Sequence, residues 1–243
     1  LLYMNFLNLS RKRTMIDSPY SIKPALQSIV NATTGQVIGY EVLARWTEGW
    51  MNDALPMEKI NSPVTIDWRS VDRKIIESLL FSTEHMAQLE GRFFINVSND
   101  TLINEACFSY WKSKLLDLLW LVNLPITIEI VESIEDTVLE SRWKEFERLG
   151  VTLALDDFGK QNSTLDRLKR YEWSFCKIDI KEGDITQEAL EFCQTKSISV
   201  IAEQVESEFF SQKAFERGLD QHQGFLYGLP FFLRGKKSNE KLV

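Results

Sequence analysis

Short β-rich runs alternate with helical runs along most of this 243-residue sequence, and the alternation constrains the fold more than any other feature. The β-rich runs occupy 26–46, 92–98, 126–133, 151–157, 175–180, 199–205 and 222–228. The helical runs occupy 67–81, 106–120, 134–150, 163–171, 186–196 and 207–219. Strands that alternate with helices in this way are typical of a parallel sheet covered by helices.

The number of strands predicts an α/β fold of the barrel type. The run at 26–46 has the pattern of two strands joined by a turn at Thr34 and Gly35, which brings the total to about eight. Eight strands in this order favour a closed TIM (β/α)8 barrel over an open sheet. Because the first two strands resemble a hairpin, we expect a modified barrel with one antiparallel strand.

The overall composition excludes several classes of function. The net charge is −7 and the pI is near 5.1, whereas proteins that grip long nucleic acids need clustered Lys and Arg. No run approaches the roughly 18 apolar residues of a membrane span. Cys107, Cys176 and Cys193 are odd in number and lack the spacing of a zinc site. We therefore expect reduced thiols and a cytoplasmic protein, with neither long nucleic acid as partner nor a membrane span.

Polar side chains stand near the carboxyl ends of seven predicted strands. They are Glu41, Asn96, Glu129, Asp156 with Asp157, Lys177, Glu203 and Gln223. The strand ends of a parallel barrel converge on one mouth, where barrel enzymes keep their catalytic residues, so these side chains are expected to meet. Taken singly, an acid at a strand end is more often a helix N-cap or an ion-pair partner, and that alternative stays open.

Five carboxylates in one mouth would repel one another with only Lys177 to balance them. Divalent cations would relieve that repulsion. Carboxylate and amide oxygens without His or Cys suit Mg²⁺ or Mn²⁺ and disfavour zinc or copper. Adjacent aspartates such as Asp156 and Asp157 could serve two neighbouring ions, an arrangement used to hydrolyse phosphodiesters.

Seven short motifs follow one another along the chain. They read EVLARW (41–46), INVS (95–98), EIVES (129–133), DDFG (156–159), KID (177–179), AEQVE (202–206) and QGFLYGLP (223–230). In kind and order they resemble the motifs of EAL domains, bacterial phosphodiesterases that hydrolyse cyclic di-GMP. We therefore expect an EAL domain at 20–235, preceded by an N-terminal extension or linker at 1–19 and followed by a C-terminal tail at 236–243.

The resemblance implies two metal positions. Glu41, Asn96, Glu129 and Asp156 would bind the first Mg²⁺ or Mn²⁺ ion, and Asp156 with Asp157 would bind the second. Ca²⁺ is expected to inhibit, as implied by the same resemblance.

The resemblance also assigns roles in catalysis and substrate binding. Lys177 would orient or activate the attacking water, with Glu203 and Gln223 assisting. Gln27 and Arg45 occupy positions that face the dinucleotide in relatives, and linear pGpG would be the product. The partners implied are cyclic di-GMP, a second copy of the chain in a homodimer, and an attached sensory or GGDEF-like module.

Two stretches depart from the family pattern. Active relatives carry DDFGTGYSSL, whereas this chain reads DDFGKQNSTL, with Lys160, Gln161 and Asn162 in place of Thr, Gly and Tyr. Gly adopts positive φ at little cost and Gln usually does not, so a changed backbone freedom is expected. In the family this loop contacts a glutamate that is Glu132 here. Gln204 likewise replaces a glycine of the AEGVE motif.

Two functions of different classes follow. The first is a metal-dependent cyclic di-GMP phosphodiesterase, because every direct ligand position and Lys177 are retained. The alternative is a domain impaired in catalysis by its altered loop, which would act as a cyclic di-GMP sensor or as a protein-binding regulator.

Overall fold

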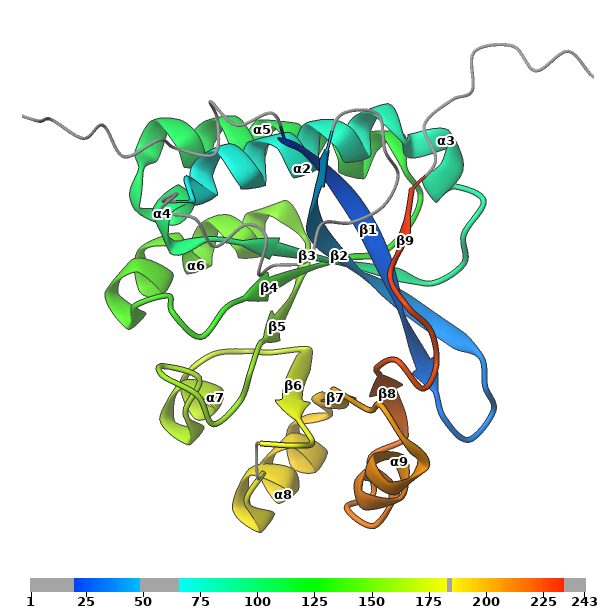
Figure 1. The fold of residues 1–243 in the computed structure, drawn as a ribbon. Coiled ribbons are helices and arrows are strands. Elements are labelled where there is room, and N and C mark those ends of the chain that lie inside the picture. Colours follow the sequence, from blue (N-terminus) through cyan, green and yellow to red (C-terminus); the bar gives the residue numbers. More distant parts are fainter. Residues whose placement is uncertain (1–19, 49–65, 183–184, 234–243) are drawn as a thin grey trace, which may run out of the picture.

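Seven parallel strands and one antiparallel strand close into a barrel in the computed structural model, which describes residues 20–48, 66–182 and 185–233 (Figure 1). The strands are β1 (Tyr20–Asn31), β2 (Val37–Glu48), β3 (Arg92–Val97), β4 (Ile126–Ile130), β5 (Thr152–Leu155), β6 (Phe175–Asp179), β7 (Ser199–Glu203), β8 (Gln221–Gln223) and β9 (Phe231–Phe232). Each strand from β2 to β7 pairs in parallel with the next. The predicted modified TIM barrel is confirmed.

The antiparallel strand β1 closes the barrel by pairing with both β2 and β8. The turn that joins β1 to β2 contains Gly35 at φ 73°, a conformation that suits glycine. In the resulting register Gln27 lies opposite Glu41, and Ile29 lies opposite Gln223. The hairpin therefore brings polar residues that are far apart in sequence to one part of the barrel.

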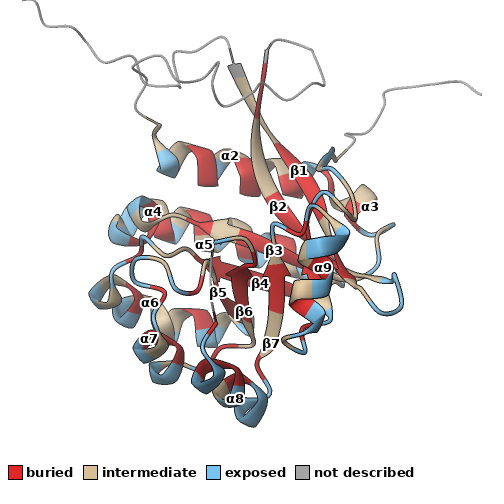
Figure 2. Cartoon of the chain, turned by 60° about the horizontal axis from the view of Figure 1, so that its bottom comes forward, coloured by how far each residue is buried: buried red, intermediate tan, exposed pale blue. Residues whose placement is uncertain are grey.

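Helices cover the outside of the barrel, and their buried faces line its wall (Figure 2). They are α2 (Trp68–Phe81), α3 (Thr83–Met86), α4 (Asn99–Ile103), α5 (Glu105–Leu121), α6 (Asp136–Leu149), α7 (Leu165–Arg170), α8 (Gln187–Lys196) and α9 (Glu208–Phe215). α2 lies in the predicted helical run 67–81, and its apolar face, including Val71, Ile75 and Leu79, is buried. Among the described residues, no helix combines the length and the apolar character needed to cross a membrane.

Apolar side chains fill the barrel, so the polar residues at its mouth lie on a packed core. One cluster inside it comprises Ile29, Phe94, Ala154 and Ile201, each from a different strand. A larger apolar cluster packs between the strands and the surrounding helices. Burial of this kind stabilises the strands and fixes the direction in which their last residues project.

The last predicted strand is wrong in extent. The run at 222–228 was expected to be extended, but β8 ends at Gln223. A Cβ atom on Gly224 would lie 2.1 Å from the carbonyl oxygen of Val205, so the chain crosses the end of β7 there and turns. The short elements α3, α4 and β9 were not predicted.

Some expectations concern residues that the structure does not describe. The extension at 1–19 and the tail at 236–243 lie outside the described residues.

Candidate active site

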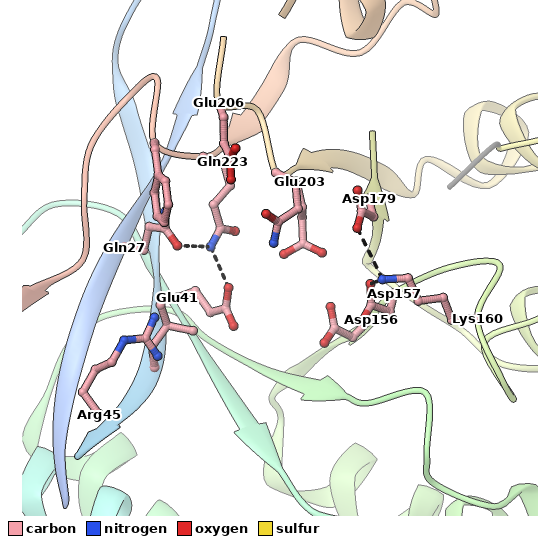
Figure 3. Close-up of a pocket in the computed structure, with 14 residues that line it drawn as sticks. Gln27, Glu41, Arg45, Asp156, Asp157, Lys160, Asp179, Glu203, Glu206 and Gln223 are labelled. Atoms are coloured by element: carbon pink, nitrogen blue, oxygen red, sulfur yellow. Dashed lines mark hydrogen bonds and ion pairs between the residues drawn. The ribbon is translucent and has the colours of Figure 1, made fainter. Parts of the chain in front are cut away.

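The polar residues predicted at the strand ends gather at one mouth of the barrel. Glu41 projects from β2, Asn96 from β3, Glu129 from β4, Lys177 from β6, Glu203 from β7 and Gln223 from β8, and the Asp pair directly follows β5. Lys177 contacts acids from four other segments, which establishes the convergence by distance rather than by pattern. Figure 3 shows several of these side chains around a common cavity.

Lys177 stands at the centre of a cage of four carboxylates. Its Nζ lies 2.7 Å from an oxygen of Glu129, 2.8 Å from Glu203, 3.2 Å from Glu41 and 3.4 Å from Asp156. The side chain of Lys177 is only 1% exposed and that of Glu129 is fully buried. One ammonium group cannot neutralise four buried carboxylates, so the cage carries an excess of negative charge.

Burial is the main cause of the raised pKa values of the cage acids. Burial raises the pKa of Asp156 to about 6 and the pKa of Glu203 to about 8. Burial, reinforced by Glu41, raises the pKa of Glu129 well above its usual value. Burial alone would lower the pKa of Lys177, but the surrounding carboxylates outweigh it and raise the value. The lysine therefore stays charged while several acids resist ionisation.

Glu41 is the acid that hydrogen bonds hold most firmly in its ionised form. Burial opposes its ionisation, yet Lys177, Gln223 and Asn96 together lower its pKa. The amide nitrogen of Gln223 donates to Oε2 of Glu41 over 2.6 Å, and that of Asn96 donates to Oε1 over 3.0 Å. The Asn96 amide oxygen is then the part of that side chain left to bind a cation.

A divalent cation fits this set of donors. All are oxygens, the chemistry that Mg²⁺ and Mn²⁺ prefer. Both carboxylate oxygens of Glu129 are buried without a hydrogen-bond partner, although one lies close to the Lys177 ammonium. Each of Glu132, Asp156 and Asp157 offers an oxygen within 4.8 Å of the others. These are groups that a bound cation would satisfy.

A second lysine, Lys160, lies at the outer part of the mouth; the sequence marked it as a departure from the family pattern but did not predict its contacts. Nζ of Lys160 lies 2.9 Å from Asp157, 3.3 Å from Asp179 and 3.9 Å from Glu182. Asp179 ends β6, two residues after Lys177. The quoted KID motif contained Asp179, but nothing in the sequence indicated that a loop lysine would fold back onto it.

The altered loop takes a turned conformation that glycine would adopt easily. Gln161 has φ 39° and Gln204 has φ 57°, so both glutamines accept the positive φ that was expected to be difficult for them. The Gln161 side chain donates to Glu132 over 3.1 Å, and the backbone N–H of Asn162 donates to the carbonyl of the same glutamate over 3.2 Å. These bonds offset part of the cost of the strained backbone.

The predicted substrate-facing residues line the same cavity, whose volume is about 280 Å³. Gln27 lies beside Gln223, with 3.4 Å between its Oε1 and the Gln223 amide nitrogen. Arg45 donates to the carbonyl of Ala44, and its pKa is lowered by burial despite the nearby Glu41. In Figure 3, Gln27, Glu41 and Arg45 lie on the side of the cavity opposite Lys160 and Asp179.

The chain matches the model of one known family over most of its length. The family described as EAL domain matches residues 13–230. A relative in Escherichia coli (strain K12) is named a probable cyclic di-GMP phosphodiesterase, PdeI. It is 26% identical over 233 residues, and the match covers 89% of this chain and 30% of that relative. This chain therefore spans under a third of that relative's length.

Solved structures share the fold. The Bacillus subtilis YkuI protein, described as having an EAL domain and as being in complex with the substrate c-di-GMP and calcium, superposes with a TM-score of 0.69 at 22% identity. That match covers 88% of this chain and 56% of YkuI. Klebsiella pneumoniae BlrP1, described as a manganese and cyclic di-GMP complex, has a TM-score of 0.63 at 23% identity, covering 88% and 57%.

Proposed function

This chain belongs to the EAL domain family, and we propose that it is a metal-dependent phosphodiesterase that hydrolyses cyclic di-GMP to linear pGpG. The observation that carries the proposal is the cage around Lys177, in which four carboxylates from separate segments share one buried ammonium. The names of relatives such as PdeI support the same reaction class. Residues 20–235 are proposed to form the catalytic domain, flanked by 1–19 and 236–243.

Glu41, Asn96, Glu129 and Asp156 are proposed to hold a divalent cation, Mg²⁺ or Mn²⁺. The excess negative charge of the cage supports this assignment, because a cation would replace protons that burial favours on Glu129 and Asp156. Such an ion acts as a Lewis acid toward a phosphoryl oxygen and lowers the pKa of water. A second ion at Asp156 and Asp157 belongs to the two-ion scheme that the family resemblance implies.

The remaining residues would position the reacting groups. Lys177 is proposed to orient the attacking water. Four acids hold its buried ammonium in one position, from which it can donate hydrogen bonds in fixed directions. Glu203, whose pKa is raised to about 8 by burial, can hold a proton on its carboxyl group near neutral pH. Gln223 would keep Glu41 in place by its hydrogen bond.

Substrate binding is proposed for Gln27 and Arg45. Arg45 can bind a phosphate with two parallel hydrogen bonds, and its place on the cavity wall opposite Asp179 supports that role. The acidic cavity by itself would repel a dianionic dinucleotide, so the bound cation and Arg45 are both needed to bind it. We propose a cytoplasmic location, which the free thiols of the three cysteines support.

The test is an assay of the whole chain with cyclic di-GMP and Mn²⁺, with the nucleotide products separated by chromatography. We expect pGpG from the unaltered protein, little product with EDTA or with Ca²⁺ in place of Mn²⁺, and loss of about 10²-fold or more in rate for Glu41→Ala. The control is Glu140→Ala, which changes an exposed acid on α6. Absence of pGpG from the folded, Mn²⁺-loaded protein contradicts the proposal.

The contacts of the altered loop favour one alternative, a cyclic di-GMP sensor or protein-binding regulator without turnover. Lys160 holds Asp157, the residue assigned to the second ion, in an ion pair. This alternative predicts that the chain binds cyclic di-GMP in calorimetry with Ca²⁺ and leaves it intact with Mn²⁺. Finding pGpG in the second experiment excludes it.

A further inference from the structure

We infer that the ammonium group of Lys160 takes the place of one of the two divalent cations, so that this chain binds a single divalent ion in its mouth. The inference rests on the proposed function, since it concerns the number of ions in the same site. It assigns to Lys160 a role that the family resemblance does not supply, because the family carries Thr at this position.

The contacts of Lys160 are those of a bound cation rather than of a solvated surface lysine. Its Nζ lies within 4.0 Å of three carboxylates, which belong to Asp157, Asp179 and Glu182. Hydrogen bonds and charge from Asp157 and Asp179 raise the pKa of Lys160. The side chain lines the same cavity as Glu41, Asp156 and Glu203, and Figure 3 shows its Nζ between Asp157 and Asp179.

The loop aims Lys160 inward by its backbone. Asp157 has φ 48° and Gln161 has φ 39°, so a residue with a left-handed backbone lies on each side of Lys160 in the chain. The Lys160 N–H donates to the Asp157 carbonyl over 3.0 Å, and the Ser163 N–H donates to the Lys160 carbonyl over 2.8 Å. A tight turn closed at both ends points the long side chain back over the Asp pair.

The electrostatics disfavour a second ion beside this ammonium. In the two-ion scheme that the resemblance implies, Asp157 is the ligand that the second ion does not share with the first, and Lys160 already pairs with it. Glu132, another acid close to Asp157, accepts a hydrogen bond from the Gln161 amide. A divalent cation bound to Asp157 would stand next to the positive charge of Lys160 and be repelled by it. The inner position also stands beside an ammonium, that of Lys177, but four side chains from separate segments would hold an ion there, whereas the outer position depends on Asp157, which Lys160 contacts at 2.9 Å.

The experiment counts bound Mn²⁺ ions without substrate, by dialysis of the whole chain against Mn²⁺ at increasing concentration followed by elemental analysis. We expect one ion per unaltered chain. We expect two for Lys160→Thr, which restores the family residue, and for Lys160→Gln, which removes the charge and keeps most of the length. Lys160→Arg keeps the charge and should bind one.

The control is Lys169→Thr, which removes another lysine paired with an acid, Glu188, outside the cavity lining. It should bind one ion, and melting curves establish that each variant is folded. Two ions on the unaltered chain, or one ion on both folded neutral variants, overturn the inference and leave the proposed function standing. No ion on any variant contradicts the proposed metal site itself, and the inference with it.

Discussion

The two lysines of the barrel mouth neutralise acids in opposite ways. Lys177 projects from the strand β6 into the barrel, is 1% exposed, and contacts four acids that strands and one strand end hold in place. Lys160 projects from a loop, is 35% exposed, and contacts acids from that loop and from the end of β6. The ammonium group of Lys177 is fixed by the strands of the barrel. That of Lys160 is supplied by a loop whose sequence differs from that of relatives.

This difference would let a site keep its strand residues and still change the number of ions that it binds. Replacing a strand residue such as Lys177 disturbs every acid that faces it. Replacing a loop residue adds or removes a charge at the rim and leaves the strands unchanged. We therefore expect the acids around Lys177 and the acids around Lys160 to respond very differently to mutation, pH and metal.

The largest effect is expected from Lys177→Met. Removing one partner of a buried ion pair leaves uncompensated charge and typically costs about 3–5 kcal/mol of unfolding free energy. The loss of the group proposed to orient the water should lower the rate by about 10²–10⁴-fold. Urea unfolding and the pGpG assay measure the two effects. Lys160→Met is the matched control, and an equal loss of stability in both variants would refute the contrast between the lysines.

The second-largest effect is expected in the pH dependence of stability, which the acids around Lys177 control. The folded-state pKa is about 8 for Glu203 and about 6 for Asp156, both above their usual values. Between pH 5 and 8 the folded state therefore holds more protons than the unfolded state. The unfolding free energy of the metal-free protein should fall as pH rises through this window, at up to about 1.4 kcal/mol for each pKa unit of difference.

Urea unfolding in EDTA from pH 5 to 8 measures this slope, and Glu203→Gln should flatten it. Mn²⁺ binding releases the same protons, so saturating Mn²⁺ should stabilise the protein more at pH 8 than at pH 5.5. A metal-free stability that increases over this range would show that the cage acids are not the groups held protonated.

The smallest effect is expected from Lys160→Thr on stability. Its ion pairs are partly exposed and screened, so their loss should change the unfolding free energy by at most about 1 kcal/mol. Thermal or urea unfolding at low salt measures the change. A destabilisation as large as that of Lys177→Met would mean that the outer lysine is a structural part of the barrel rather than a cation placed at its rim.

Most of the fold could be predicted because the periodic segments are long and their burial is regular. The apolar face of α2 and the stop of α6 at Gly150, which has φ 68°, follow from residue pattern alone. The extent of β8 could not be predicted, because it depends on the contact of Gly224 with the backbone of Val205, nineteen residues earlier in the chain.

The strand half of the candidate site was predictable for the same reason. Once the strands are assigned, residues such as Glu41 and Glu129 must converge at the carboxyl end of the barrel. The loop half was not. A lysine in a polar loop is by default solvated, and Lys160 reaches the acids from a turn in which Asp157, Gly159 and Gln161 have positive φ. Conformations of that kind leave no periodic signal in a sequence.

The most direct test of the central claim is the rate of pGpG formation from cyclic di-GMP as Mn²⁺ is added to the metal-free chain. The account predicts no product in EDTA and a rate that rises with Mn²⁺ and then saturates, with Glu41→Ala remaining inactive throughout. The same rate in EDTA as in Mn²⁺, or bound but uncleaved cyclic di-GMP at every Mn²⁺ concentration, would contradict it.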